Sequence, residues 1–291
     1  MPPCAACSPG FEDGDSDDPE THFSPFPGNV NNLLVYLPTY AKAVSGEDAG
    51  VVEEFVNPKY VDSSRTTFKK PTRLECMMQD LPKLLAKEVG AAAKVGFTTM
   101  ERWLTFSPAK NAPGAGAALA AAGSPPGSPG SSEADVYAAW RRILAQACGA
   151  AIGAGPEQAF AGLKLRLLPA VSLAPSFAAT SSELARRFGP GARISGTSCL
   201  VVRGDVTVGG GLDLDGALVL AAAPGTSLTV APGLRVRNKG WEFAPVDVDD
   251  GGAPEHERIR GFALLKHEAL IVEVSEPGDW LLDADFTVSK A

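Results

Sequence analysis

Three stretches of the chain place apolar residues at the three- and four-residue spacing of an amphipathic helix. Residues 30–44 form the first stretch, although Pro38 is expected to break or kink it. The second begins near Arg73, and the third spans Glu133–Cys148, where the apolar positions share one helical face. The pattern therefore predicts helices in each of these regions.

The second stretch has a predicted start signal. Thr72 and Glu75 have the spacing of a capping box, and Pro71 keeps the preceding chain extended, so a helix is expected to start at Arg73. Lys69 and Lys70 lie just upstream of that start. Since a helix N-terminus already favours anions, the two ammonium groups indicate a possible phosphate site; the alternative is a surface helix with two solvated lysines.

Shorter apolar runs predict strands. In the first two thirds of the chain they cover residues 51–56, 94–98 and 161–173. From Arg193 onward, β-rich runs alternate with Gly, Asp and Pro turns, over Cys199–Arg203, Leu212–Leu214, Ala217–Leu220, Ser227–Val230 and Leu234–Arg237. This spacing predicts a small β-solenoid or barrel. Gly209–Gly211 joins two of these runs and opens no helix, so it is expected to form a turn and not a nucleotide loop.

Two stretches have no apolar periodicity. Residues 1–22 are acidic and turn-rich, and a flexible N-terminus is expected there. Residues 107–132 are rich in Gly, Pro, Ala and Ser, and they are expected to form a mobile, low-complexity insert.

Composition adds a constraint on partners. The chain is 45% hydrophobic and 21% charged, which excludes wholesale disorder, and its net charge is −8. An acidic balance without a basic cluster argues against non-specific nucleic-acid binding and against anionic membranes. A phosphorylated substrate would need local positive charge, and Lys69, Lys70 and Arg73 supply it.

The cysteines and histidines give no evident metal motif. Five scattered cysteines are typical of reduced thiols in an intracellular protein, and Cys4 and Cys7 have no second pair or nearby histidine to complete a zinc site. His22, His256 and His267 are widely separated. No signal peptide or membrane span is visible, so a soluble cytoplasmic protein is expected.

Several longer strings match one family in the same order. They are Glu20–Asn31, Glu54–Tyr60, Phe68–Asp80, Ser198–Leu220, Asn238–Trp241 and Arg258–Phe262. Together they resemble the C-terminal half of the UDP-sugar pyrophosphorylases of plants, algae and protists, over about Pro9 to Asp279 outside the low-complexity insert.

The resemblance implies an α/β fold in two parts. Residues 23–190 would be the C-terminal part of a Rossmann-like, mixed-sheet nucleotidyltransferase domain, which contains the 107–132 insert. Residues 191–291 would be a small β-solenoid or β-helix domain. The implied activity is a uridylyltransferase that joins UTP and a sugar 1-phosphate into a UDP-sugar and releases pyrophosphate, with Mg²⁺ (or Mn²⁺) held mainly by the substrate phosphates and by the family's N-terminal half.

The same resemblance assigns residue roles. Lys69 matches the position of a phosphate-contacting catalytic lysine, with Lys70 and Arg73 as additional positive charges. Asn29 and Asn31 match a sugar-contacting segment, which suits an amide that both donates and accepts hydrogen bonds; the alternative is that they cap a helix before Leu33. The remaining implied substrate-binding residues are Glu20, Thr21 and Gly28.

Two departures from the family pattern change what is expected of sugar binding and of the activity of the isolated chain. His22 stands where relatives commonly have glycine, which puts sugar binding at that position in question. The family's N-terminal half, with its glycine-rich nucleotide loop, has no counterpart in the sequence, so the isolated chain is expected to be inactive. The alternative function is a non-catalytic fragment that binds sugar phosphates or serves in assembly.

Overall fold

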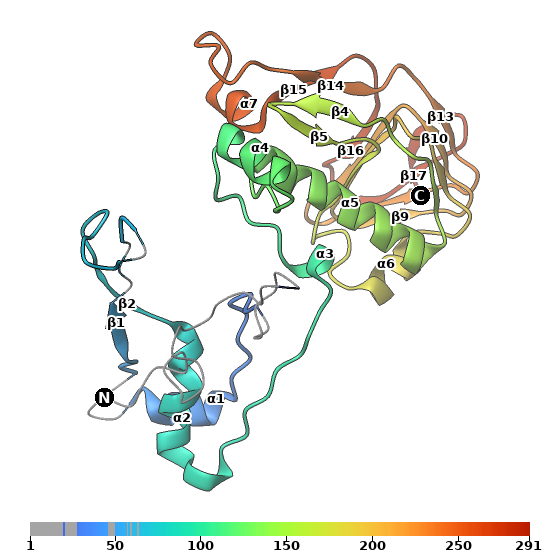
Figure 1. The fold of residues 1–291 in the computed structure, drawn as a ribbon. Coiled ribbons are helices and arrows are strands. Elements are labelled where there is room, and N and C mark those ends of the chain that lie inside the picture. The colour runs from blue at the N-terminus through green and yellow to red at the C-terminus, as the bar shows by residue number, and fades with distance from the viewer. Residues whose placement is uncertain (1–19, 21–27, 46–49, 57, 59, 63) are drawn as a thin grey trace. The chain divides into compact units, whose positions relative to one another are not determined.

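The computed structural model describes residues 20, 28–45, 50–56, 58, 60–62 and 64–291. The chain divides into two compact units, Met1–Glu101 (unit 1) and Arg102–Ala291 (unit 2) (Figure 1). Among the described residues, no helix combines the length and the apolar character needed to cross a lipid bilayer.

The described part of unit 1 contains a two-stranded sheet and two helices. Strand β1 (Glu54–Val56) pairs antiparallel with β2 (Leu74–Cys76), and helix α1 (Leu37–Ala43) packs against α2 (Leu81–Val89). Short 3-10 turns, Met78–Asp80 and Gly90–Ala92, flank α2. Both helices have proline in the first turn, where the missing N–H would have no helical partner.

That position of proline explains one difference from the sequence prediction. Pro38 was expected to break a helix over residues 30–44, but it lies in the first turn of α1 and so marks the start of a shorter helix. The predicted strand at 51–56 is confirmed in its second half as β1. The predicted strand at 94–98 is wrong, because residues 93–101 have no regular structure.

The helix predicted from Arg73 is also wrong. Residues 74–76 form β2, and α2 begins only at Leu81. Pairing with β1 gives this segment inter-strand hydrogen bonds, which a capping signal four residues long does not outweigh. The Thr72 hydroxyl is buried and has no hydrogen-bond partner among the described residues, so it caps no helix.

Near the start of unit 2 lies the segment that was expected to be a mobile insert, and there the structure has helices where the sequence analysis predicted none. After the short helix α3 (Arg102–Thr105), the low-complexity stretch forms helix α4 (Pro113–Ala121) and the first turn of α5 (Pro129–Cys148). Alanine has the highest helix propensity, which accounts for α4 despite its lack of an apolar face. Asn111 closes the following loop by donating its side-chain N–H to the Pro126 carbonyl at 2.9 Å.

Helix α5 confirms the third predicted helix and begins four residues earlier than expected. Ser128 is its N-cap: the Ser128 hydroxyl accepts from the Ser131 backbone N–H, and the Ser131 hydroxyl accepts from the Ser128 N–H. Leu144 and Cys148 are buried, and Trp140 packs against the same core. The predicted apolar face is therefore the face that covers the core.

The described residues of unit 2 include three four-stranded sheets. Sheet I contains β3 (Ala151–Ile152), β7 (Arg193–Ile194), β10 (Asp213–Asp215) and β13 (Arg235–Arg237). Sheet II contains β6 (Ala170–Leu173), β8 (Cys199–Arg203), β11 (Ala217–Ala222) and β16 (Leu270–Val274). Sheet III contains β9 (Val206–Val208), β12 (Thr226–Val230), β17 (Gly278–Leu282) and β18 (Val288–Lys290).

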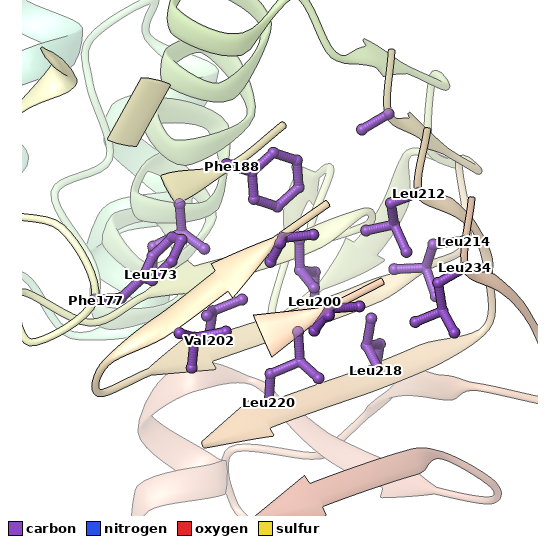
Figure 2. Packing of buried hydrophobic residues seen from close by; sticks show 14 of the residues in the cluster. Leu173, Phe177, Phe188, Leu200, Val202, Leu212, Leu214, Leu218, Leu220 and Leu234 are labelled. Carbon is purple, nitrogen blue, oxygen red and sulfur yellow. The ribbon is translucent and has the colours of Figure 1, made fainter. Parts of the chain in front are cut away.

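The chain visits these sheets in a repeating order, β7–β8–β9 and then β10–β11–β12, and every pairing except β17–β18 is parallel. The register stacks apolar residues above one another, as with Leu200 beside Leu218 and Val208 beside Val230. Figure 2 shows these leucines pointing into one core together with Phe177 and Phe188, which are fully buried. Interior stacking of this kind stabilises the sheets by burying apolar area.

A second core cluster is built around two hairpins. Strands β4 (Gln158–Phe160) and β5 (Leu163–Leu165) form one, and β14 (Trp241–Pro245) and β15 (Phe262–Lys266) form the other, with helix α7 (Glu255–Arg260) in the connection. The Phe262 ring meets the Phe160 and Phe243 rings edge-on, at centroid distances of 5.3 and 5.4 Å. Helix α6 (Ser181–Arg187) precedes β7.

The chain is thus an α/β protein with parallel and mixed sheets, compatible with the predicted nucleotidyltransferase-like class. The strands predicted after Arg193 are confirmed within one or two residues, and Gly209–Gly211 forms a turn between β9 and β10. The boundary predicted at 190/191 falls inside unit 2, because β3 and β6 before it pair with β7 and β8 after it.

Candidate functional site

The two lysines of the predicted phosphate site lie on an extended segment of unit 1. Phe68, just before them, bridges to Tyr60, and the two rings lie 5.3 Å apart. Lys69 and Lys70 follow and lead into β2, and both are exposed. Ten residues lie between Lys70 and Leu81, the first residue of α2, so the lysines do not lie at a helix N-terminus. Any attraction for phosphate must therefore come from the ammonium groups themselves.

Both ammonium groups are free of carboxylates among the described residues: no ion pair within 4.0 Å involves either lysine. Lys83 on α2 provides a contrast. Its ammonium lies 2.9 Å from Asp80 and 3.4 Å from Glu53, and the hydrogen bond to Asp80 raises the pKa of Lys83. The positive charge at positions 69 and 70 is thus available to a ligand, whereas the charge at Lys83 is already compensated.

The predicted sugar-contacting asparagines form a tight turn. The backbone N–H of Asn31 donates to Oδ1 of Asn29 at 2.6 Å, and Asn31 has a left-handed backbone with φ of 59°. Asparagine tolerates this conformation better than most residues. The alternative that these residues cap a helix before Leu33 is wrong, because α1 begins at Leu37 and its N-cap residue is Tyr36.

A long-range contact joins this turn to the segment after β2. The side-chain N–H of Gln79 donates to Oδ1 of Asn31 at 2.6 Å. Gln79 received no role in the sequence analysis, although it lies inside one of the strings that carry the family resemblance. The missed signal was its amide, which has the same donor and acceptor chemistry as the asparagines.

The other predicted residues are placed as follows. Gly28 and Glu20 are exposed, and Arg73 is exposed with its guanidinium 3.6 Å from Glu75. Thr21 and His22 lie outside the described residues. The structure therefore brings Asn29, Asn31 and Gln79 together, and no hydrogen bond or ion pair among the described residues links them to Lys69.

The described residues show no cluster of metal-ligating side chains. They contain no group of three or more His, Cys, Asp or Glu side chains that could hold one. No residue of this chain is therefore assigned as a ligand of Mg²⁺ or Mn²⁺.

The family string Asn238–Trp241 has a structural role in unit 2. Oδ1 of Asn238 accepts from the N–H of Ala217 at 2.7 Å and from the N–H of Gly240 at 3.0 Å, and Nδ2 donates to the Ala217 carbonyl at 3.0 Å. The Asn238 side chain thus gives the backbone N–H and carbonyl of Ala217 the hydrogen-bond partners that a neighbouring strand would supply elsewhere in a sheet. A Cβ at Gly216 would lie 2.3 Å from Oδ1 of Asn238, so this contact requires glycine there.

The string Arg258–Phe262 is also structural. The Arg260 guanidinium lies 3.2 Å from a carboxylate oxygen of Glu133 on α5 and 5.0 Å from the centroid of the Phe262 ring. Tyr137 donates its hydroxyl to Glu133 at 2.7 Å, and burial raises the pKa of Tyr137. These contacts tie α7 to α5.

Three curated proteins that are similar to this chain share a name. A protein of Arabidopsis thaliana named "UDP-sugar pyrophosphorylase" is 36% identical over 274 residues, which is 94% of this chain and 43% of the relative. Proteins of the same name from Oryza sativa subspecies japonica and indica are each 38% identical over 261 residues, 90% of this chain and 41% of the relative. No family model matches the chain.

These comparisons confirm the resemblance predicted from the sequence. The chain spans about two fifths of the length of these relatives, which is consistent with their C-terminal half.

Proposed function

We propose that this chain is the C-terminal part of a UDP-sugar pyrophosphorylase, a uridylyltransferase. In the proposed reaction, a phosphate oxygen of a sugar 1-phosphate attacks the α-phosphorus of UTP. A new P–O bond forms, the bond between the α-phosphorus and the oxygen bridging to the β-phosphorus breaks, and pyrophosphate leaves with that electron pair. The similarity to named UDP-sugar pyrophosphorylases over at least 90% of the chain carries this proposal.

Lys69 is the proposed catalytic residue. Its ammonium, exposed and unpaired among the described residues, would neutralise charge on the phosphates as the new bond forms. Lys70 and Arg73 would add long-range attraction for the same anion. The turn at Asn29 and Asn31 would hold the sugar hydroxyls, together with Gly28, Glu20 and Thr21.

The metal in this proposal belongs to the substrates. Mg²⁺ or Mn²⁺ bound to the triphosphate would reduce repulsion between the reacting phosphates. We route no step through it, since no group of three potential metal-ligating side chains lies together in the described chain.

We further assign the three sheets of unit 2 to the expected β-solenoid domain. The support is the order in which the chain visits them, one strand in each sheet per turn, with parallel pairing in register between turns. In this assignment unit 2 carries no reacting group.

An assembly role is the second candidate function, and an observation in unit 1 favours it. Large apolar side chains are exposed there: Leu34, Tyr36, Leu37, Leu74 and Phe97 are each more than 60% exposed. Ala43 and Leu84 are the buried apolar residues among the described part of the unit. A unit with so small a core gains stability when further polypeptide covers its apolar side chains, and the part of the relatives that this chain does not span could supply it.

Calorimetric titration of the 291-residue chain with glucose 1-phosphate or galactose 1-phosphate tests the proposed site. We expect saturable binding that weakens about tenfold in Lys69→Ala, because one charge-assisted contact is lost. Lys94→Ala is the matched control: Lys94 is also exposed and lies in no ion pair of the described chain. Equal affinity in all three proteins would refute the role of Lys69.

A second measurement separates the two candidate functions. The chain alone, supplied with UTP, Mg²⁺ and a sugar 1-phosphate, is expected to release no appreciable pyrophosphate, because it spans only about two fifths of the relatives' length and the family resemblance places the nucleotide loop in the part that it does not span. Addition of the N-terminal half of a relative is expected to restore turnover if the chain is catalytic. If that addition gives a stable complex without turnover, the assembly role is favoured.

A further inference from the structure

Among the described residues, unit 2 has a cavity of about 310 Å³ that is lined by three arginines and no acidic residue. Arg141 and Arg142 come from α5, and Arg166 comes from the segment between β5 and β6. The other lining residues are apolar or glycine: Ala138, Ile152, Gly153, Ala154, Gly155 and Pro169. The lining therefore offers cationic donors and no anionic acceptor.

Two of the three guanidinium groups are held in place. Arg141 donates from Nη1 to the carbonyl of Pro169 at 2.7 Å and of Leu167 at 3.3 Å, and from Nη2 to that of Arg166 at 3.3 Å. Cζ of Arg142 lies 4.2 Å from the centroid of the Trp103 ring. Groups that are already fixed lose little conformational entropy when a ligand arrives.

The positive charge of the cavity is not compensated. Within the described residues, none of the three guanidinium groups forms an ion pair. Other arginines of unit 2 do: Arg203 lies 2.7 Å from Glu273, and Arg260 lies 3.2 Å from Glu133. Burial and the neighbouring charge of Arg166 lower the pKa of Arg141, as expected where cations face one another without an anion.

A purely structural role accounts for only part of this arrangement. The three carbonyl contacts of Arg141 hold the segment before β6 in place, and this structural role is enough to explain an arginine at position 141. They do not explain why Arg142 and Arg166 line the same cavity in a chain whose net charge is −8. A bound anion would offset the repulsion among the three.

We propose that this cavity binds the phosphate group of a small phosphorylated molecule. The planar guanidinium fork matches phosphate oxygens and donates two parallel hydrogen bonds to them. The volume lies at the lower end for ligand cavities, which suits orthophosphate, pyrophosphate or a sugar phosphate rather than a macromolecule. The site lies in unit 2, uses none of the residues proposed for catalysis, and does not depend on the proposed function.

Calorimetry on the full chain tests the proposal, with Lys69→Ala and Lys70→Ala present throughout to weaken binding in unit 1. Orthophosphate, pyrophosphate and glucose 1-phosphate are titrated separately. The compound with the highest affinity identifies the kind of phosphorylated molecule that the cavity binds. We expect saturable binding of at least one. Arg142→Gln combined with Arg166→Gln is expected to weaken it by about tenfold or more. Arg141 stays intact because it clamps the backbone.

Arg186→Gln is the matched control, since Arg186 is exposed on α6, lies in no ion pair of the described residues and does not line the cavity. Amide NMR gives a positional readout: the phosphate that binds is expected to shift the signals of Gly153 and Gly155. If the double variant does not fold, the affinity of Arg166→Gln alone tests the proposal, because Arg166 is exposed and its substitution should not disturb the fold. Lack of saturable binding, equal affinity in the folded variant, or tighter binding of citrate than of every phosphate would overturn the proposal.

Discussion

Gln79 donates a 2.6 Å hydrogen bond to the side chain of Asn31, across 48 residues of sequence. The bond holds the turn in which Asn31 has its left-handed backbone and in which Asn29 accepts the N–H of Asn31. The proposed sugar-contacting turn is thereby fixed to the segment that follows the two lysines. Its geometry is set by side-chain amides rather than by a helix.

Gln79→Ala is therefore expected to weaken sugar 1-phosphate binding by severalfold. The loss of one exposed hydrogen bond corresponds to about 0.5–1.5 kcal/mol, and the turn at Asn31 becomes freer. Calorimetric titration of the sugar 1-phosphate measures the change. Gln146→Ala, an exposed glutamine on α5, is the control and should leave the affinity unchanged. An affinity equal to that of the unaltered chain would show that the Asn31–Gln79 bond does not support the binding site.

The sequence predicted the strands of unit 2 better than the elements of unit 1, for a physical reason. Strands such as β8 and β11 are short apolar runs bounded by Gly, Asp and Pro turns, so their limits are set by residues within the run. β8 pairs with β11, which follows it closely in sequence, whereas the pairing of β11 with β16, with Leu218 beside Leu270, depends on a distant segment. This local pattern predicted the strands, whereas the α/β class was implied by the family resemblance.

At residues 72–76 the local and the long-range signals disagree. The capping-box spacing of Thr72 and Glu75 favours a helix, but β1, twenty residues earlier, offers a pairing partner that a window of local sequence does not reveal. The same applies to the candidate site: Lys69 could be identified from the family string, whereas the Asn31–Gln79 contact depends on how two distant segments meet.

Asn238→Ala is expected to destabilise unit 2 by about 2–3 kcal/mol. The substitution removes three hydrogen bonds and leaves the backbone N–H and carbonyl of Ala217 without their partner. Chemical denaturation followed by circular dichroism measures the free energy of unfolding. Lys239→Ala is the control at the next residue: it removes an exposed ion pair with Glu268, which solvent screens, and should cost much less than Asn238→Ala. Equal effects of the two substitutions would contradict the structural role of Asn238.

Cys199 is expected to make stability fall as the pH rises from about 9 to about 11. Burial raises the pKa of its thiol from 9.0 to about 11, against the opposing effect of backbone N–H groups. Between these values the unfolded chain releases the proton while the folded chain keeps it, so deprotonation favours unfolding. The full loss corresponds to about 2–3 kcal/mol.

Denaturation of Cys199→Ala across this pH range isolates the effect. The variant lacks the thiol, so its stability should decline less steeply than that of the unaltered chain. Cys76→Ala, which removes an exposed thiol, should follow the unaltered chain. Parallel pH profiles for all three proteins would mean that Cys199 is not linked to folding in this way.

Lys69→Ala is expected to lower turnover by about 10²–10³-fold in an enzyme completed with the N-terminal half of a UDP-sugar pyrophosphorylase. That range corresponds to the loss of one electrostatic contact aimed at charge that develops during phosphoryl transfer. Lys70→Ala should cost much less, because the family match places the contact at Lys69. Pyrophosphate release with UTP, Mg²⁺ and a sugar 1-phosphate measures both.

The structure makes this comparison informative, because both ammonium groups are exposed and neither is paired with a carboxylate in the described chain. Differences between the two variants therefore cannot arise from a broken ion pair among these residues. Lys94→Ala, also at an exposed lysine, reports the effect of losing one positive charge elsewhere in unit 1. If both Lys69→Ala and Lys70→Ala keep full turnover and unchanged affinity while folded normally, the lysines are solvated surface residues without a catalytic role.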